Sequence, residues 1–304
     1  MAVLLSSGNR LFALANSGRR QTHPLLAVLV AILVGGLGAV AGAVLVLPLL
    51  LAASPVIAPA LGLVVLFLPL YLLLWAWLAW FERRPFRSLG FEGQGAGRKA
   101  LGGALLGIGM FAAVVALLAV AGAVAWDPQR ERVGPAALGA VLAMLVGYGV
   151  QGPAEEVLFR GWLLPTIGAR SRPWIGVVVS AGLFAVFHGL NPGVTALAFV
   201  NLVLVGVFLA LWALAEGGLW GVSAWHALWN WTQGSLFGLA VSGGEFGPSL
   251  LALETRGPAP LSGGEFGPEA SLATTLVLGL GITVLVLRAR RARPPRKGVE
   301  ERML

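Results

Sequence analysis

The sequence contains no cysteine among its 304 residues. Disulfides, thiolate metal sites and cysteine nucleophiles are therefore excluded, and the redox compartment is left undetermined. The chain also lacks the contiguous metalloprotease signature His-Glu-x-x-His, in which two histidines one helical turn apart bind zinc. Any zinc site in this chain must therefore use imidazole and carboxylate ligands from separate stretches.

Charged residues are also scarce, at 11% of the chain, whereas 58% of the residues are hydrophobic. So much apolar surface cannot be hidden in one soluble core, which predicts an all-α, polytopic integral membrane protein. The formal net charge of +8 would suggest a nucleic-acid partner in a soluble domain. Here the basic residues lie in short loops and tails between apolar runs, so membrane lipid, and no nucleic acid, is the expected partner.

Eight apolar runs are each near the ~20 residues that about 30 Å of hydrocarbon requires, which predicts about eight transmembrane helices. The runs cover residues 25–51, 57–81, 100–126, a stretch from about 135 through 162, 173–188, 194–214, 219–239 and 271–287. We interpret 1–304 as a single membrane domain. Its parts are a basic arm at 1–24, a seven-helix core at 25–239 with its motifs in 153–230, a loop at 240–270, the last helix at 271–287 and a basic tail at 288–304.

The positions of the 21 Lys and Arg residues indicate the topology. The N-terminal arm, the loops after the second and fourth runs and the tail hold 3, 5, 2 and 7 of them, whereas the opposite loops hold only Arg130, Arg132 and Arg256. The positive-inside rule then predicts that both termini are cytoplasmic, and we expect the cell membrane. The non-cytoplasmic 240–270 loop repeats Ser-Gly-Gly-Glu-Phe-Gly-Pro at 242–248 and 262–268, which we interpret as a paired turn.

Besides Arg160, the ionisable residues at membrane depth are Glu155, Glu156, His188 and His226. One ionised residue at a bilayer centre costs at least roughly 2.5 kcal/mol, so these groups must face a polar cavity or each other. Glu156 and Arg160 are four residues apart and share a helix face, which predicts an ion pair. Glu155 points about 100° away and is free for another role.

The turn at residues 170–172 joins the fourth and fifth runs. Glu155 lies about 16 residues before this turn and His188 about 16 after it, so we expect both side chains at one depth, within direct or one-water hydrogen-bond reach. His226 fits less well, because it lies only about nine residues past Glu216-Gly217, a mismatch of roughly 10 Å. Either the hairpin of the fourth and fifth runs projects into the cytoplasm or the boundaries of the runs are wrong.

Three stretches on successive runs, Glu-Glu-x-x-x-Arg, Phe-x-x-x-His and His-x-x-x-Asn, are similar to the motifs of the CPBP intramembrane proteases. This family includes the type II CAAX prenyl proteases and bacteriocin-processing proteins, and the resemblance covers about residues 135–237. It implies hydrolysis of a peptide bond in a peptide or membrane-protein substrate, at a polar site between the fourth, fifth and seventh helices. The positions that match the motifs are Glu155, Glu156, Arg160, His188, His226 and Asn230.

Amide hydrolysis needs a base to activate water and donors to hold the oxyanion. Glu155 with His188 fits the base, while His226 and Asn230 fit the donors. The metal alternative uses Glu155, His188 and His226 as zinc ligands with an open position for water. We favour a glutamate-activated water without a tightly held metal, because Asn is a poor zinc ligand and a good donor. In addition, the other intramembrane carboxylate is matched to Arg160, so it is not expected to orient a metal-bound histidine.

Two other classes of protein remain open. An ion-coupled transporter would use intramembrane Glu and His as relay groups, but the chain shows no two-fold internal repeat and no matching pair of broken helices. A non-catalytic membrane scaffold or immunity factor of the same family would carry the same residues without using them. Residues with a structural interpretation are Trp220, Trp225, Trp229 and Trp231, as belt and packing residues, and Gln151 and Asn201, as interhelical hydrogen-bond partners.

Overall fold

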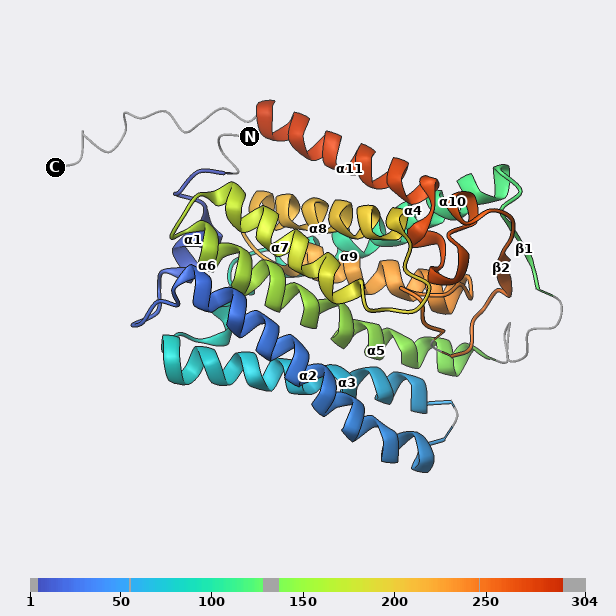
Figure 1. The fold of residues 1–304 in the computed structure, drawn as a ribbon, viewed down its shortest axis with the longest axis horizontal. Coiled ribbons are helices and arrows are strands. Elements are labelled where there is room, and N and C mark those ends of the chain that lie inside the picture. Colours follow the sequence, from blue (N-terminus) through green and yellow to red (C-terminus); the bar gives the residue numbers. More distant parts are fainter. Residues whose placement is uncertain (1–4, 55, 128–136, 246, 292–304) are drawn as a thin grey trace.

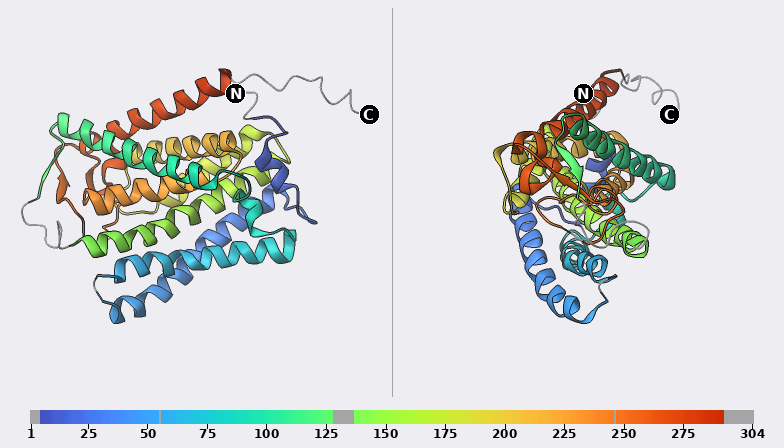
Figure 2. Two further views of the ribbon diagram at one scale, coloured as in Figure 1. Left: turned by 180° about the vertical axis from the view of Figure 1, so that it is seen from behind. Right: turned by 90° about the vertical axis from the view of Figure 1, so that its right-hand side faces the viewer.

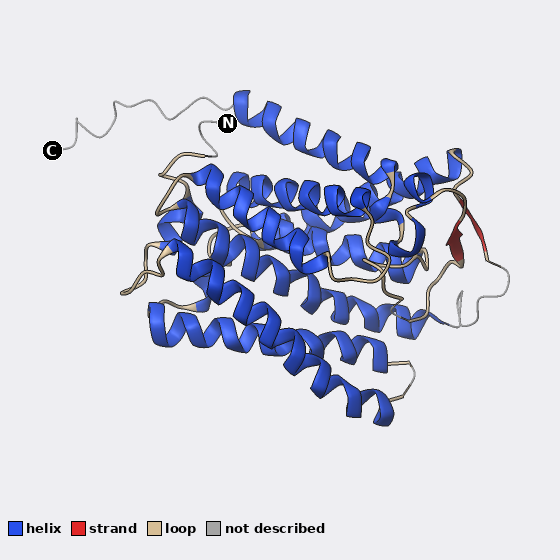
Figure 3. Cartoon of the chain, in the orientation of Figure 1, coloured by secondary structure: helices blue, strands red, loops and turns tan. Residues whose placement is uncertain are grey.

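The computed structural model describes residues 5–54, 56–127, 137–245 and 247–291. Over these residues the chain is mostly helical, with one pair of short strands (Figure 3), so the predicted all-α class is confirmed. The start of the fourth run near residue 135, the residues Arg130 and Arg132, and the tail beyond residue 291 lie outside the described residues.

In the described part of the chain, eight long helical bodies run along the long axis of the molecule, one for each apolar run (Figure 1). The short helix α1 (Arg10–Ala15) and the C-terminal end of the last body lie at one end of the molecule, as an even number of crossings requires. The bodies are α2 (Pro24–Ala52), α3 (Ala58–Ala76) with the π-helix η1 (Trp77–Glu82), α4 (Ala96–Val120), α5 (Leu138–Glu156) with the π-helix η4 (Val157–Leu163) and α6 (Leu164–Gly168), α7 (Pro173–His188), α8 (Ala196–Glu216), α9 (Trp220–Trp231) with the π-helix η5 (Thr232–Leu236), and α11 (Leu272–Arg291).

Five described helices are long and apolar enough to cross a membrane: the spans in α2, α3 with η1, α4, α8 and α11. α7 is apolar but shorter, and the bodies built on α5 and α9 carry the polar motifs. The α2–α3 pair and α11 lie at opposite margins of the bundle (Figure 2) and expose side chains such as Leu29, Leu72 and Leu276. Apolar faces of this extent are stable in hydrocarbon, and the chain is an integral membrane protein.

α9 is held between α4 and α5 by glycines that let the backbones approach. A Cβ added at Gly107 of α4 would lie 2.5 Å from the carbonyl oxygen of Trp225, and one at Gly152 of α5 would lie 2.8 Å from the amide nitrogen of Ala227. Small residues at helix contacts are how membrane helices pack closely without a hydrophobic driving force. This packing fixes the height and rotation of the helix that carries the third motif.

The hairpin of α6 and α7 extends beyond the level at which α9 begins. Gly161 of η4 lies against Leu219, the residue before α9, whereas α6 continues to Gly168, which packs against Phe12 of α1. These seven further helical residues span roughly 10 Å, which accounts for the predicted depth mismatch of His226. The hairpin therefore projects past the start of α9, at the end of the bundle that α1 covers.

A buried polar cluster connects the segments at this end of the bundle. The carboxylate of Glu82 accepts hydrogen bonds from the Thr22 hydroxyl at 2.6 Å, Nε of Arg84 at 2.6 Å and Nε1 of Trp162 at 3.0 Å. The start of α2, the end of η1 and the π-helix η4 thereby share one carboxylate. Because a buried carboxylate must be hydrogen-bonded or paired, the cluster fixes the base of the helix that carries the first motif.

The opposite end differs from the sequence prediction. Residues 124–126, predicted as the end of the third helix, form β1 (Val124–Trp126), which pairs antiparallel with β2 (Leu253–Thr255). α4 ends earlier because Gly122 adopts a φ of 67°, a conformation that glycine reaches without the steric cost of a side chain.

The 240–270 loop is also more structured than predicted. It contains β2, α10 (Ala259–Ser262) and two 3-10 helices, η6 (Gly264–Phe266) and η7 (Pro268–Ala270). The two heptapeptide copies meet where the amide of Gly243 donates to the carbonyl of Phe266 at 2.9 Å. They are linked turns of different form, since the first copy closes through a bridge between Val241 and Gly244 and the second is a 3-10 helix.

Candidate functional site

The three motifs converge on one cavity of about 320 Å³. Glu155 reaches it from the end of α5, His188 from the last residue of α7, and His226 and Asn230 from successive turns of α9. Glu156 and Arg160 lie behind these four residues and are fully buried. All six residues predicted from the sequence therefore lie in one continuous cluster, four of them facing the cavity.

Glu155 has one engaged and one free carboxylate oxygen. Oε1 accepts a hydrogen bond from Nε2 of Gln151 at 2.7 Å. Oε2 is buried, has no hydrogen-bond partner among the described residues, and lies 3.5 Å from Nε2 of His188 and 3.7 Å from Nε2 of His226. The contact predicted between Glu155 and His188 is therefore present, and a second imidazole shares the same oxygen.

The other nitrogen of each imidazole is held by an acceptor. Nδ1 of His188 lies 2.9 Å from the carbonyl oxygen of Phe184, and Nδ1 of His226 lies 2.8 Å from Oε1 of Glu156. Because a carbonyl and a carboxylate only accept hydrogen bonds, each Nδ1 carries the proton. In a neutral ring, Nε2 then has no proton and presents its lone pair. Two lone pairs and a carboxylate oxygen face one another, so a donor such as water or an added proton is required between them.

Glu156 has two partners. Nη1 of Arg160 lies 3.0 Å from Oε1, which confirms the ion pair predicted from the spacing of four residues. The same oxygen accepts from His226, which the sequence analysis did not predict. The guanidinium of Arg160 also lies over the ring of Phe184, 4.4 Å from its centroid, so the pair is enclosed by packing as well as by charge. The assumption that Glu156 serves only Arg160 is therefore wrong.

Gln151 belongs to the site although we assigned it only an interhelical hydrogen bond. Nδ2 of Asn230 donates to Oε1 of Gln151 at 2.8 Å, and Gln151 donates to Glu155. α9 thus orients the carboxylate on α5 through one amide. The spacing of four residues between Gln151 and Glu155 is the sequence signal that could have revealed this connection, because it puts both side chains on one helix face.

The cavity also contains a carboxylate that the sequence analysis left in the outer loop. Glu269 of η7 lines the cavity beside His188. Its Oε2 accepts from the amide and the hydroxyl of Ser242 and from Nε2 of Gln233. Burial raises the pKa of the Glu269 carboxyl above its ordinary value, against the hydrogen bonds and the nearby His188, which lower it. No local pattern marks this residue, because only the folded loop brings it to the site.

Replacing Glu269 by Gln is expected to flatten part of the pH dependence of stability. Because its pKa is raised in the folded state, the wild-type carboxyl stabilises the fold fully when the pH is below its ordinary pKa of about 4.5. This stabilisation is lost as the pH rises through the folded-state pKa. The melting temperature of Glu269→Gln minus that of the wild type should therefore increase from pH 4 to pH 8. Parallel melting curves for the two proteins would contradict a buried titrating carboxyl at this position.

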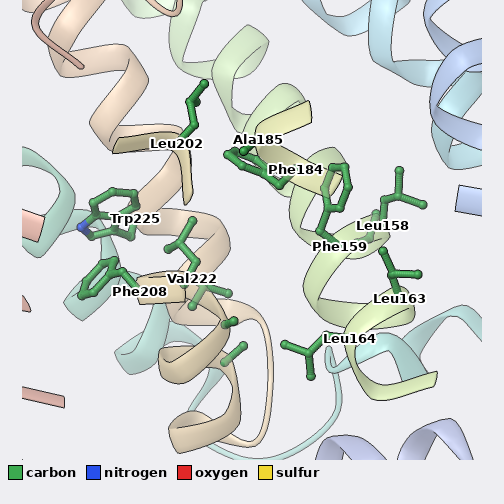
Figure 4. Packing of buried hydrophobic residues seen from close by; sticks show 14 of the residues in the cluster. Leu158, Phe159, Leu163, Leu164, Phe184, Ala185, Leu202, Phe208, Val222 and Trp225 are labelled. Atoms are coloured by element: carbon green, nitrogen blue, oxygen red, sulfur yellow. The ribbon is translucent and has the colours of Figure 1, made fainter. Parts of the chain in front are cut away.

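Aromatic packing forms the wall between the motifs. Phe159 of η4 and Phe184 of α7 meet edge to face, with centroids 5.4 Å apart (Figure 4). On α9, Trp225 and Trp229 stack at 4.7 Å and are buried, as the packing interpretation predicted. Asn201 donates to backbone oxygens near the start of α11, which agrees with its predicted structural role. These contacts give the polar side chains a rigid apolar frame.

The opposite wall of the cavity is apolar and comes from the α2–α3 pair. Gly35 and Gly38 of α2 and Leu66, Phe67 and Leu70 of α3 line it. The cavity is therefore polar on the side of α5, α7 and α9 and apolar on the side that faces the two marginal helices. A binding site of this kind takes a largely apolar ligand and orients it with a few polar groups.

The fold and site together define an all-α polytopic membrane protein with a buried carboxylate and imidazole centre. Residues 137–232, less than half of the chain, match the family model of the type II CAAX prenyl endopeptidase Rce1-like proteins. The matched stretch contains all six motif positions, so the resemblance seen in the motifs is confirmed, and this part of the chain carries an Rce1-like domain. No curated protein and no solved structure matches the chain.

The metal alternative assigned Glu155, His188 and His226 as zinc ligands. Within the described residues, no group of three or more His, Asp or Glu side chains is placed to hold a metal ion. One of our reasons against zinc is nevertheless wrong. His226 presents its second nitrogen to Glu156, which is the partner that a metal-bound histidine normally has.

Proposed function

We propose that the protein is an intramembrane endopeptidase that hydrolyses a peptide bond of a membrane-associated or lipidated protein by carboxylate-activated water. The observation that carries the proposal is Oε2 of Glu155, which is buried, has no hydrogen-bond partner among the described residues and faces two imidazole nitrogens. The family match over residues 137–232 supports the same class of reaction.

Glu155 is the proposed base. A water between its Oε2 and Nε2 of His188 gives a proton to the carboxylate, and the water oxygen attacks the carbonyl carbon of the peptide. The electron pair of the carbonyl moves to oxygen and forms the tetrahedral oxyanion. When the C–N bond breaks, Glu155 returns the proton to the leaving nitrogen, so that a carboxylic acid and an amine form without net proton consumption. Gln151 supports this role by engaging Oε1 and leaving Oε2 for the water.

His226 and Asn230 are the proposed donors to the oxyanion. When both ring nitrogens of His226 carry protons, Nδ1 donates to Glu156 and Nε2 remains to donate into the cavity. Asn230 gives one N–H to Gln151 and has a second available. Donors that are fixed before the reaction stabilise the developing charge without reorganisation. Glu156 and Arg160 act through His226 and are positioning residues in this scheme.

The membrane setting supports a membrane-associated substrate. The apolar wall from α2 and α3 suits an apolar peptide segment, whose scissile bond would then face the polar wall. We place the protein in the cell membrane with both termini in the cytoplasm. This orientation is supported by the uneven distribution of Lys and Arg and by the position of α1 and the end of α11 at one end of the bundle.

The proposed function is tested by reconstitution of the purified protein in proteoliposomes with membrane-anchored peptides. We expect peptide cleavage. Flux of a solute or of protons without cleavage would support the transporter class, and neither activity would support a non-catalytic scaffold or immunity factor.

A second prediction concerns zinc. Protein purified without a chelator or a metal-affinity column is expected to contain far less than one zinc per chain, because a glutamate-activated water needs no tightly held metal. Elemental analysis of wild type and of His188→Ala measures this directly. Near-stoichiometric zinc that disappears in His188→Ala together with activity would overturn the metal-free mechanism.

A further inference from the structure

A basic hollow lies on the surface where η1 ends, away from the catalytic cavity. It is lined by Arg19 of the N-terminal arm, by Trp80, and by Arg83 and Arg84, which follow the helix. Arg19 and Arg83 are exposed and form no ion pair with the described residues. Two exposed guanidinium groups thus border one open volume, at the end of the bundle to which α1 and the basic loops belong.

Arg84 also lines this hollow, but its side chain is fully buried. The residue is only 4% exposed. Its Nε is paired with Glu82, and its Nη1 donates to Leu14 and Ser88. Nη2 is buried and has no partner among the described residues. The Arg84 guanidinium therefore belongs to the buried Glu82 cluster. Glu82 cannot neutralise the hollow, since its carboxylate also accepts from Thr22 and Trp162.

An apolar groove adjoins the hollow. It runs between α2 and η1 and is lined by Val30, Leu33 and Leu37 on one side and by Leu73 and Trp77 on the other. Trp80 lines both the hollow and the groove, and it is 72% exposed. Tryptophan at this position is typical of the boundary between hydrocarbon and headgroups. The α2–α3 pair lies at the margin of the bundle (Figure 2), so the groove opens to the membrane.

We propose that the hollow and groove bind one anionic phospholipid, with its phosphate at Arg19 and Arg83 and an acyl chain along α2 and η1. Guanidinium groups bind phosphate through paired charge-assisted hydrogen bonds, and basic pockets beside membrane helices bind anionic headgroups. A free phosphate would satisfy the guanidiniums but would leave the groove empty. The continuity of the two volumes at Trp80 therefore favours a lipid.

The lipid would contact α2 and α3, which also line the catalytic cavity. Gly35 and Gly38 of α2 and Leu70 of α3 face that cavity, whereas Leu33 and Leu37 face the groove. A lipid bound outside would thus hold the apolar wall in place. Lipid binding itself does not depend on the proposed peptidase activity, and it is tested separately from it.

The test compares Arg19→Gln/Arg83→Gln with a matched control, Arg20→Gln/Arg98→Gln. The control removes the same charge from exposed arginines that do not line the hollow. Arg84 is left intact because it belongs to the Glu82 cluster. Each purified protein in detergent is titrated with phosphatidylglycerol, phosphatidylcholine and inorganic phosphate. Retained lipid is measured by native mass spectrometry, and the melting temperature is followed in parallel.

We expect the wild type and the control to retain phosphatidylglycerol in preference to phosphatidylcholine, and the hollow variant to retain it roughly tenfold or more weakly. All three proteins should melt at the same temperature without lipid, because Arg19 and Arg83 are exposed. Equal retention by the hollow variant, or an equal loss in the control, would overturn the site. A full thermal shift with inorganic phosphate alone would overturn the lipid as its occupant.

Discussion

Peptide cleavage is expected to fall by roughly 10² to 10⁴ when Glu155 is replaced by Gln, which is the range attributed to a general base. The amide keeps the shape of the side chain and its acceptor for Gln151, but it cannot take a proton from water. Because Oε2 of Glu155 has no hydrogen-bond partner among the described residues, the protein should fold normally. The measurement is a comparison of membrane-protein fragments from cells that carry the wild type or the variant.

Glu254→Gln is the matched control for this experiment. Glu254 lies on β2, is partly exposed and forms an ion pair with Arg256 two residues away, so its replacement removes a carboxylate without touching the cavity. Fragments should be unchanged in Glu254→Gln and reduced by roughly 10² to 10⁴ in Glu155→Gln. If Glu155→Gln retained wild-type cleavage, Glu155 would not be the base, and if the wild type produced no fragments, the non-catalytic alternative would be favoured.

The helices could be predicted from the sequence because hydrocarbon imposes a length on every apolar run. The fifth run was predicted at 173–188 and forms α7 over the same residues, Pro173–His188. The ends of other elements were predicted less well. β1 replaces the end of the third run because pairing with β2, more than a hundred residues away in the sequence, decides its conformation, and local hydrophobicity carries no information about such a partner.

The heights of the motifs could be predicted only where a short turn connects two helices. Glu155 and His188 flank such a turn, and counting residues on both sides was sufficient to predict their contact. His226 follows a separate hairpin, and its height depends on how α9 packs against Gly107 and Gly152. That packing also creates the bond between His226 and Glu156. Glu269 shows the same limit, because its place in the cavity is set by a folded loop.

Glu156→Gln is expected to destabilise the protein by roughly 3–5 kcal/mol, the cost of removing one partner of a buried ion pair. Glu156 is fully buried, and its Oε1 serves both Arg160 and His226. The variant leaves the guanidinium charge in the core without a counter-ion, and the amide is a weaker acceptor for Nδ1 of the imidazole. Glu155→Gln removes no such pair and should melt close to the wild type.

Thermal melts in detergent compare these two variants with Glu156→Gln/Arg160→Gln. If the loss comes from the stranded charge, the double variant should melt above Glu156→Gln, because two neutral side chains cost less there than one unpaired guanidinium. Equal melting temperatures for Glu155→Gln and Glu156→Gln would contradict the division between a reacting and a positioning carboxylate. If the double variant instead melts below both Glu155→Gln and Glu156→Gln, the loss of stability comes from the packing of the guanidinium against Phe184.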